Sequence, residues 1–274
     1  MDRHMDVAEG RLSYRVRGAG RRVLLVHAGV FGGWFEGLWD EGALDGLELI
    51  DYRRIGYGPS SRPDQTPSIA DHAQHAAALL DRLGPATVVA HSSGCLVALE
   101  LAAARPDLTE GLVLLEPALT DVPSHARLGA QVVGPAMGRF KAGDVAGALD
   151  TFMAGLCGPG WRPVFESRFG EEARAGALAD AAWFFAHETP AILGWRWDEP
   201  RLGQIACPVL LLEGTDSTAV NPVFGEQVER AAALLPKAER AEVPGTHMAP
   251  LQFPAAMAER IAGFVADRVP LAIS

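Results

Sequence analysis

The sequence predicts an α/β protein whose mostly parallel sheet carries helices on both faces. Short apolar stretches typical of buried strands recur along the chain, for example at residues 23–26, 87–91 and 111–115. Stretches with helical spacing, such as residues 69–83, separate them. Strands that alternate with helices pair in parallel, and the helices then cover both faces of the sheet. The length of 274 residues and the hydrophobic content of 49% are ample for one large core.

The first elements follow from alternation and from apolar runs. Residues 11–17 alternate polar and apolar side chains, as a strand does. Residues 23–26 are apolar without interruption, which is typical of a strand buried on both faces. We expect a helix at residues 33–44, a short strand at residues 47–51 and a helix at residues 69–83.

The middle and the end of the chain keep the same rhythm. A strand at residues 87–91 leads into a helix at residues 96–104, and residues 111–115 form another unbroken apolar strand. Later elements are expected as strands at residues 208–212 and 241–243 and as helices at residues 225–235 and 255–269. These elements complete the alternation on which the predicted parallel sheet depends.

The interval between Pro117 and Ile205 breaks this rhythm, because it contains no convincing strand. Residues 142–156 and 171–187 instead have the pattern of helices. We therefore expect a helical insertion that caps the main domain. The expected division is a core of residues 1–117 and 205–274 with a cap of residues 118–204.

Aromatic side chains are concentrated in this expected cap. Four of the six tryptophans lie there, namely Trp161, Trp183, Trp195 and Trp197. Most of them should pack the cap onto the core. A lid creates a concave, mostly apolar site where it meets a sheet, and we expect Trp183, Phe184 and Trp195 to line it.

Composition excludes several other classes of function. The net charge is −10 and no basic block occurs, which argues against nucleic acid or an anionic membrane as a partner. The early apolar runs are too short for a signal peptide or a membrane span, so a cytoplasmic protein is expected. Cys95, Cys157 and Cys207 are odd in number and widely spaced, which suits neither a disulfide framework nor a metal site.

Residues 87–94, T-V-V-A-H-S-S-G, are the most informative segment of the chain. They predict a strand, a very tight turn with Ser92 at its apex, and a helix. Such a turn strains the serine backbone and lifts the hydroxyl above the edge of the sheet. Strand and helix nearly touch there, so small residues are needed at Ala90 and Gly94. The helix N-terminus and the N–H of Ser93 would then point at negative charge forming beside Ser92.

This segment resembles the nucleophile elbow of the α/β-hydrolase superfamily, although the usual pattern has glycine where Ala90 stands. The resemblance covers about residues 11–117 and 205–268 and implies an eight-stranded, mostly parallel sheet with an inserted cap. The loop H-A-G-V-F-G-G-W resembles the superfamily's oxyanion loop, which implies that Gly29 or Val30 donates an N–H opposite Ser93. The stretch D-Y-R-R-I-G-Y-G-P-S-S-R-P resembles the segment commonly written D-x-R-G-x-G-x-S.

A serine nucleophile needs a base, and in this superfamily the base is a histidine near the C-terminus. His247 fits, since it stands in V-P-G-T-H-M-A-P between a predicted strand and the last helix. His72 and His75 lie on an amphipathic helix and should be solvated. His91 should point away from Ser92, because successive side chains on a strand alternate. His27 should brace the loop that follows it.

A carboxylate must orient His247, and two candidates stay open. Asp216 lies one residue before the position where the superfamily usually has its acid, which is Ser217 here. Glu116 ends the strand next to the elbow strand, where some members place their acid. A buried glutamate at the end of an apolar strand needs a partner, and His247 would be one, so we place Glu116 slightly ahead. Glu213 is a third candidate.

The resemblance therefore implies a serine hydrolase that works through an acyl-enzyme on Ser92. An ester, lactone or thioester of a mostly apolar small molecule is the expected substrate, and no metal or organic cofactor is required. A monomer or homodimer is expected. Three alternatives stay open: a C–C bond hydrolase, a non-hydrolytic lyase or cyclase of small-molecule biosynthesis, and a relative that only binds a ligand.

Overall fold

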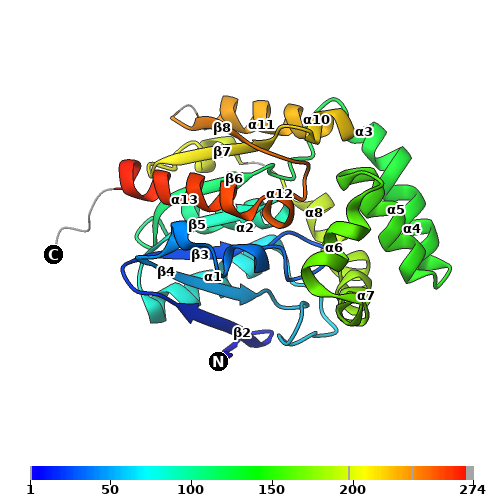
Figure 1. The fold of residues 1–274 in the computed structure, drawn as a ribbon, viewed down its shortest axis with the longest axis horizontal. Coiled ribbons are helices and arrows are strands. Elements are labelled where there is room, and N and C mark those ends of the chain that lie inside the picture. The colour runs from blue at the N-terminus through cyan, green and yellow to red at the C-terminus, as the bar shows by residue number, and fades with distance from the viewer. Residues whose placement is uncertain (1, 197, 236, 270–274) are drawn as a thin grey trace.

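A computed structural model describes residues 2–196, 198–235 and 237–269. Its centre is an eight-stranded sheet in the order β1-β2-β4-β3-β5-β6-β7-β8 (Figure 1). The strands are β1 (Arg3–Val7), β2 (Gly10–Arg17), β3 (Arg21–Val26), β4 (Leu47–Arg53), β5 (Ala86–His91), β6 (Thr109–Leu115), β7 (Val209–Gly214) and β8 (Glu239–Val243). Strand β2 pairs antiparallel with β1 and β4, and the other pairs are parallel. The predicted fold class is confirmed.

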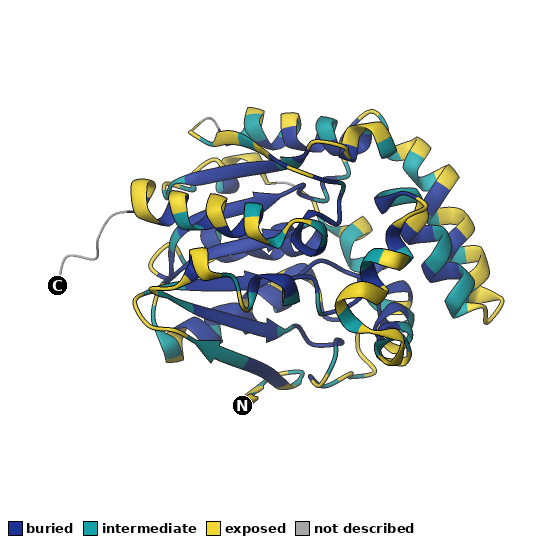
Figure 2. Cartoon of the chain, in the orientation of Figure 1, coloured by how far each residue is buried: buried dark blue, intermediate teal, exposed yellow. Residues whose placement is uncertain are grey.

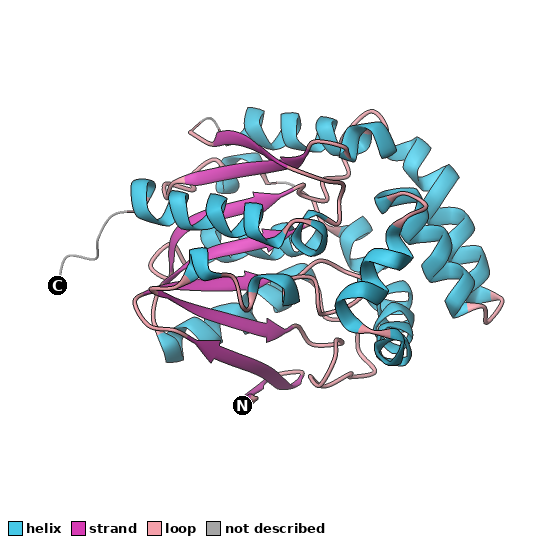
Figure 3. Ribbon diagram, viewed as in Figure 1, coloured by secondary structure: helices cyan, strands magenta, loops and turns pink. Residues whose placement is uncertain are grey.

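Helices cover both faces of the sheet, as Figure 3 shows. The main ones are α1 (Ile69–Leu83), α2 (Ser93–Ala104), α11 (Val223–Leu234) and α13 (Pro254–Arg268). Side chains of α1, α2 and α11 share one core cluster with Leu24 and Val26, whereas α13 packs with Val23 and Leu25. Neighbours along β3 therefore point to opposite layers, which is why this strand is apolar throughout. Figure 2 shows the buried strands beneath helices that are exposed only on their outer sides.

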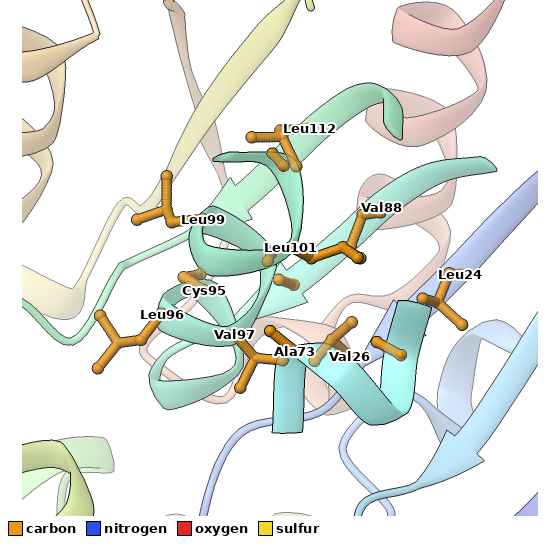
Figure 4. Packing of buried hydrophobic residues seen from close by; sticks show 14 of the residues in the cluster. Leu24, Val26, Ala73, Val88, Cys95, Leu96, Val97, Leu99, Leu101 and Leu112 are labelled. Carbon is orange, nitrogen blue, oxygen red and sulfur yellow. The ribbon is translucent and has the colours of Figure 1, made fainter. Parts of the chain in front are cut away.

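Helix α2 is buried nearly all round, since it lies between the sheet and α1 (Figure 4). Leu96, Leu99 and Leu101 are fully buried beside Val88 of the elbow strand. Burying one such leucine contributes about 1.5–3 kcal/mol, so the helix that follows Ser92 is held firmly against the sheet.

The register of the parallel strands gathers several loops at one edge of the sheet. Val26 pairs with Ala90, and His91 pairs with Leu115. Strands β3, β5 and β6 therefore end level with one another, and the residues that follow them emerge side by side. Carboxyl ends of parallel strands are where ligands bind in open α/β sheets.

In the N-terminal part, one strand was missed and one predicted helix is wrong. Strand β1 was not expected, because its mostly exposed residues lack an apolar face. The helix expected at residues 33–44 is replaced by two short 3-10 turns, η1 (Glu36–Leu38) and η2 (Gly42–Leu44). Gly37 approaches another segment closely there, since an added Cβ would lie 2.8 Å from the carbonyl oxygen of Pro250. Tertiary packing thus overrides the helical pattern.

The segment between β6 and β7 is helical, and its described residues contain no strand. Its elements are α3 (His125–Leu128), η3 (Gly129–Val133), α4 (Gly134–Lys141), α5 (Val145–Cys157), α6 (Trp161–Phe169), η4 (Glu171–Ala173), α7 (Arg174–Trp183), η5 (Phe184–Glu188), α8 (Thr189–Gly194) and α9 (Glu199–Leu202). Helices α3 to α7 gather at one end of the sheet in Figure 1. The division into core and cap domains stays a prediction.

The described part of the chain includes no helix with both the length and the apolar character needed to cross a membrane.

Helix α1 shows where the prediction about histidines was wrong. His72 and His75 are buried rather than solvated. The turn between β1 and β2 brings Glu9 over the helix, where its carboxylate contacts Nε2 of His75. Because β1 was not predicted from the sequence, the contact between Glu9 and His75 was not predicted either.

We expect the protein to lose stability as the pH falls from 7 to 5. Burial, and then the positive charge of Arg54, hold the pKa of His72 well below its usual range. The unfolded chain takes up this proton near about pH 6.5, so below that pH the unfolded state binds more protons. Each such group costs up to about 1.4 kcal/mol per pH unit. The pKa values of His27 and His91 are lowered by burial in the same direction.

Thermal unfolding between pH 5 and 7 measures this effect. His72→Gln should reduce the slope of Tm against pH, whereas His4→Gln, at an exposed position on β1, should leave it unchanged. A slope that is the same in the wild type and in both variants would contradict the expectation.

Candidate active site

Ser92 sits at the apex of the turn between β5 and α2, as the sequence predicts. Its φ of 54° lies in the left-handed region, which is strained for a residue other than glycine. Its N–H donates to the carbonyl oxygen of Leu115 at 2.9 Å, which ties the turn to β6. Helix and strand approach so closely that a Cβ added at Gly94 would lie 2.3 Å from the carbonyl oxygen of Val26. The turn therefore needs a residue without a side chain at this position.

His247 lies in the loop between β8 and α12 (Ala249–Gln252) and meets Glu116. Its Nδ1 is 2.5 Å from Oε2 of Glu116, and both side chains are buried. The other carboxylate oxygen accepts the N–H of Gly214 at 2.8 Å. An ionised carboxylate only accepts hydrogen bonds, so it selects the tautomer with the proton on Nδ1. This leaves Nε2 of His247 unprotonated and able to act as a base.

The same cavity brings together Ser92 and His247, since both side chains line it. Asp216 is exposed instead, at the start of α10 (Ser217–Val220). Glu213 accepts a hydrogen bond from Thr218 at 2.7 Å and lies 3.8 Å from Arg240. Of the three acids expected from the sequence, Glu116 is therefore the one in contact with the histidine.

Aromatic rings hold His247 on two sides. Phe224 stacks on it with ring centroids 4.4 Å apart, and the ring of His91 lies 4.4 Å away at a tilt. Burial and the neighbouring His247 keep the pKa of His91 well below its usual range, so His91 is neutral. Phe224 was not predicted as a site residue, because in the sequence it looks like any other apolar residue on the buried face of a helix.

The loop after β3 provides the opposite wall of the site. Gly29 and Val30 line the cavity together with Ser93. Val30 has a φ of 77°, and an added Cβ at Gly29 would lie 2.4 Å from the ring of Phe184. His27 braces this loop as expected, because its Nε2 accepts the N–H of Arg54 at 3.0 Å and its Nδ1 lies 2.7 Å from the carbonyl oxygen of Ala28.

The cavity beside Ser92 has a volume of about 100 Å³ and is almost entirely apolar. The described residues that line it include no aspartate, glutamate, lysine or arginine. Its walls come mainly from the segment between β6 and β7 and from α11, through side chains that include Val133, Phe152, Met153, Leu156, Phe184, Ile192, Val223 and Phe224. An uncharged, apolar group fits this environment best.

Of the three aromatic residues expected in the pocket, Phe184 lines it, whereas Trp183 and Trp195 lie elsewhere. Trp183 stacks on His187, with ring centroids 4.0 Å apart. Trp195 donates from Nε1 to Glu100 of α2 at 2.8 Å, so its ring packs on the outside of that helix. Trp197 lies outside the described residues. The tryptophans in this segment indicated that it packs on the core. The sequence could not show which side of each helix faces the cavity.

One group of side chains has the spacing of a metal site. Ligand atoms of His91, Glu116 and His247 lie within 4.8 Å of one another. Both carboxylate oxygens of Glu116 already accept hydrogen bonds, from His247 and from Gly214. Hydrogen bonding thus accounts for the arrangement of this carboxylate without a metal ion.

Comparisons with known proteins agree with this fold. The structure is similar to the enol-lactonase from Burkholderia xenovorans LB400, with a TM-score of 0.79, 18% identity and coverage of 97% of this chain and 100% of that chain. It is equally similar to a thermophilic esterase from Thermogutta terrifontis, with a TM-score of 0.79, 20% identity and coverage of 98% and 100%. At these identities the likeness shows the fold alone.

Sequence comparison adds a relative and a family. The lipase LipV of Mycobacterium tuberculosis (strain ATCC 25618 / H37Rv) is 34% identical over 149 residues, which are 54% of this chain and 53% of that lipase. The match thus spans about half the length of this relative. Residues 23–260, which hold Ser92, Glu116 and His247, match the alpha/beta hydrolase family. The chain belongs to the alpha/beta hydrolase family.

Proposed function

We propose that the protein is a serine hydrolase that cleaves an ester, lactone or thioester bond of a mostly apolar small molecule. One observation carries this proposal: His247 is held by a buried glutamate and lines the same cavity as the strained Ser92. A serine hydroxyl becomes a nucleophile when a positioned base takes its proton. Glu116 fills the role of the orienting acid in this proposal.

The reaction proceeds through an acyl-enzyme. Nε2 of His247 takes the proton of Ser92 while the serine oxygen attacks the substrate carbonyl. The N–H of Ser93 and that of Gly29 or Val30 stabilise the negative charge on the carbonyl oxygen. His247 then gives the proton to the leaving oxygen or sulfur. Water, deprotonated by the same histidine, attacks the acyl group. The bond from the acyl carbon to the Ser92 oxygen then breaks, and His247 returns its proton to that oxygen as the acid is released, so no cofactor is needed.

The cavity and the relatives support the class of substrate. The walls carry no acidic or basic side chain apart from the histidines among their described residues, so a neutral and largely apolar substrate is favoured. The similar proteins include an enol-lactonase, an esterase and a lipase. We propose that residues 118–204 act as the cap that closes this cavity, because most of its apolar wall comes from them.

A fluorophosphonate probe tests the proposed nucleophile. The wild type should be labelled, the modified residue should map to Ser92 by mass spectrometry, and Ser92→Ala should not be labelled. Ser217→Ala is the matched control, because it removes a buried serine that lies outside the proposed triad and should leave labelling intact. Absence of labelling in a folded wild type would overturn the proposal and favour a ligand-binding or non-hydrolytic relative.

A further inference from the structure

A buried charged cluster joins the segment between β6 and β7 to the turn that carries Ser92. Arg54 and Glu188 form an ion pair at 2.9 Å, and both side chains are completely buried. The same carboxylate oxygen of Glu188 accepts the hydroxyl of Ser93 at 2.6 Å. Its other oxygen accepts the hydroxyl of Tyr57. The carboxylate of Glu188 therefore contacts Ser93, the residue directly after the proposed nucleophile.

One turn of helix contacts both sides of the proposed oxyanion site. Glu188 closes η5, and Phe184 begins it. Phe184 packs so closely on Gly29 that an added Cβ there would lie 2.4 Å from the ring. The opposite end of η5 holds the side chain of Ser93. This one turn of helix thus contacts both the loop after β3 and the start of α2, whose N–H groups would bind the oxyanion.

The charges of this cluster are balanced. A carboxylate beside the site would oppose the negative charge that develops on the substrate oxygen. Burial opposes the charge on Arg54, yet the neighbouring Glu188 raises its pKa, so the guanidinium stays charged and offsets the carboxylate. Burial and Glu188 also raise the pKa of Tyr57 well above its usual range, so its hydroxyl remains a donor.

This cluster has no part in the proton transfers proposed above. The common pattern D-x-R-G-x-G-x-S has glycine at the position of Arg54. This chain therefore departs from the pattern at the residue that pairs with Glu188. A buried ion pair is seldom a net gain in stability, because desolvating two charges is costly. A role in placing the neighbouring Ser93 accounts for its position.

We infer that Glu188 is a positioning residue for the oxyanion site: through the hydroxyl of Ser93 it fixes the direction of the Ser93 N–H, while Arg54 balances its charge. The inference rests on the proposed function. A donor aimed at the transition state acts on turnover more than on substrate binding. We call the contact between Glu188 and the hydroxyl of Ser93, with Arg54 as the balancing charge, the clamp. Loss of the clamp should therefore lower kcat while KM changes little.

Two variants remove the clamp in different ways. Ser93→Ala deletes the hydroxyl and keeps both the N–H and the ion pair. Arg54→Met combined with Glu188→Leu removes both charges together, so that no buried charge is left unpaired. With a p-nitrophenyl ester, each should lower kcat by about 10- to 100-fold, which is less than the loss of a whole oxyanion donor. Combining the two should add little, because both break the same link.

Trp195→Phe is the matched control. Trp195 also joins this segment to the core, since its Nε1 donates to Glu100 of α2 at 2.8 Å, but Glu100 lies well beyond Ser93 along α2 and Trp195 is not among the described residues that line the cavity. This variant should lower Tm and leave kcat little changed. The inhibition constant of a boronic acid, a tetrahedral analogue, should rise in the clamp variants in parallel with the loss of kcat, and stay near the wild-type value in the control.

The outcomes separate the inference from the function. An active, labelled wild type whose Ser93→Ala variant keeps its kcat and its affinity for the boronic acid would overturn the clamp and leave the hydrolase proposal standing. The same holds if Trp195→Phe loses as much kcat as the clamp variants, since the effect would then be general. A folded wild type that neither reacts with the probe nor cleaves the ester overturns both.

Discussion

Glu116→Gln is expected to lower kcat on a p-nitrophenyl ester by about 10³- to 10⁴-fold, as in other hydrolases whose orienting acid becomes an amide. The carboxylate oxygen of Glu116 lies 2.5 Å from Nδ1 of His247. In the proposed mechanism it stabilises the imidazolium that would form when Ser92 gives up its proton. Glutamine has nearly the same shape but no charge. Its amide nitrogen can also face the ring, which would favour the wrong tautomer.

The matched controls are the other two acids. Asp216→Asn and Glu213→Gln should change kcat little, because Asp216 is exposed and Glu213 pairs with Thr218 and Arg240. Circular dichroism and Tm should show that all three variants fold, since the amide that replaces the Glu116 carboxylate still offers an oxygen to the N–H of Gly214. If Asp216→Asn lost as much activity as Glu116→Gln, or if both effects were small, the assignment of the acid would be wrong.

The sequence predicted best those parts of the fold that short-range patterns determine. Continuous apolar runs identified the parallel strands because both faces of those strands are buried. The turn at Ser92 was predictable because a strand, small residues and a helix follow one another within a few positions. Ala90 also fits there, fully buried in a core cluster, although the usual pattern has glycine.

Elements decided by tertiary contacts were missed. Strand β1 lies at the edge of the sheet with mostly exposed side chains, so it lacks the apolar signal of the others. The apolar residues at 33–44 suggested a helix, but the structure has two short turns there, and Gly37 lies close to Pro250. Helical spacing on α1 likewise could not show that Glu9 would cover His75.

The site itself was predictable in part. The elbow pattern led to Ser92 and the loop before the last helix led to His247, but the sequence placed Glu116 only slightly ahead of Asp216 as the acid. The structure favours Glu116 because its carboxylate contacts His247, whereas Asp216 is exposed. The pairing of Arg54 with Glu188 joins positions 134 residues apart, and a charged residue in a helix is ordinarily exposed.

Gly94→Ala is expected to destabilise the protein strongly. Its Cβ would lie 2.3 Å from the carbonyl oxygen of Val26 and 2.6 Å from that of His27. These are backbone atoms of a buried strand and of the braced loop after it, so neither can rotate aside. Forcing α2 away from the sheet should cost about 3 kcal/mol or more. That corresponds to a fall in Tm of roughly 10 °C for a domain of this size.

Gly138→Ala provides the matched control, because Gly138 also lies in a helix but an added Cβ would meet nothing within 4 Å. The same substitution should there raise stability by about 0.5–1 kcal/mol, since alanine favours helix more than glycine does. Labelling of Ser92 by the fluorophosphonate should be lost in Gly94→Ala well below its Tm, because the turn and the Ser93 N–H move with the helix. A Gly94→Ala protein with wild-type Tm and labelling would show that the strand and the helix have room between them for a side chain at this position.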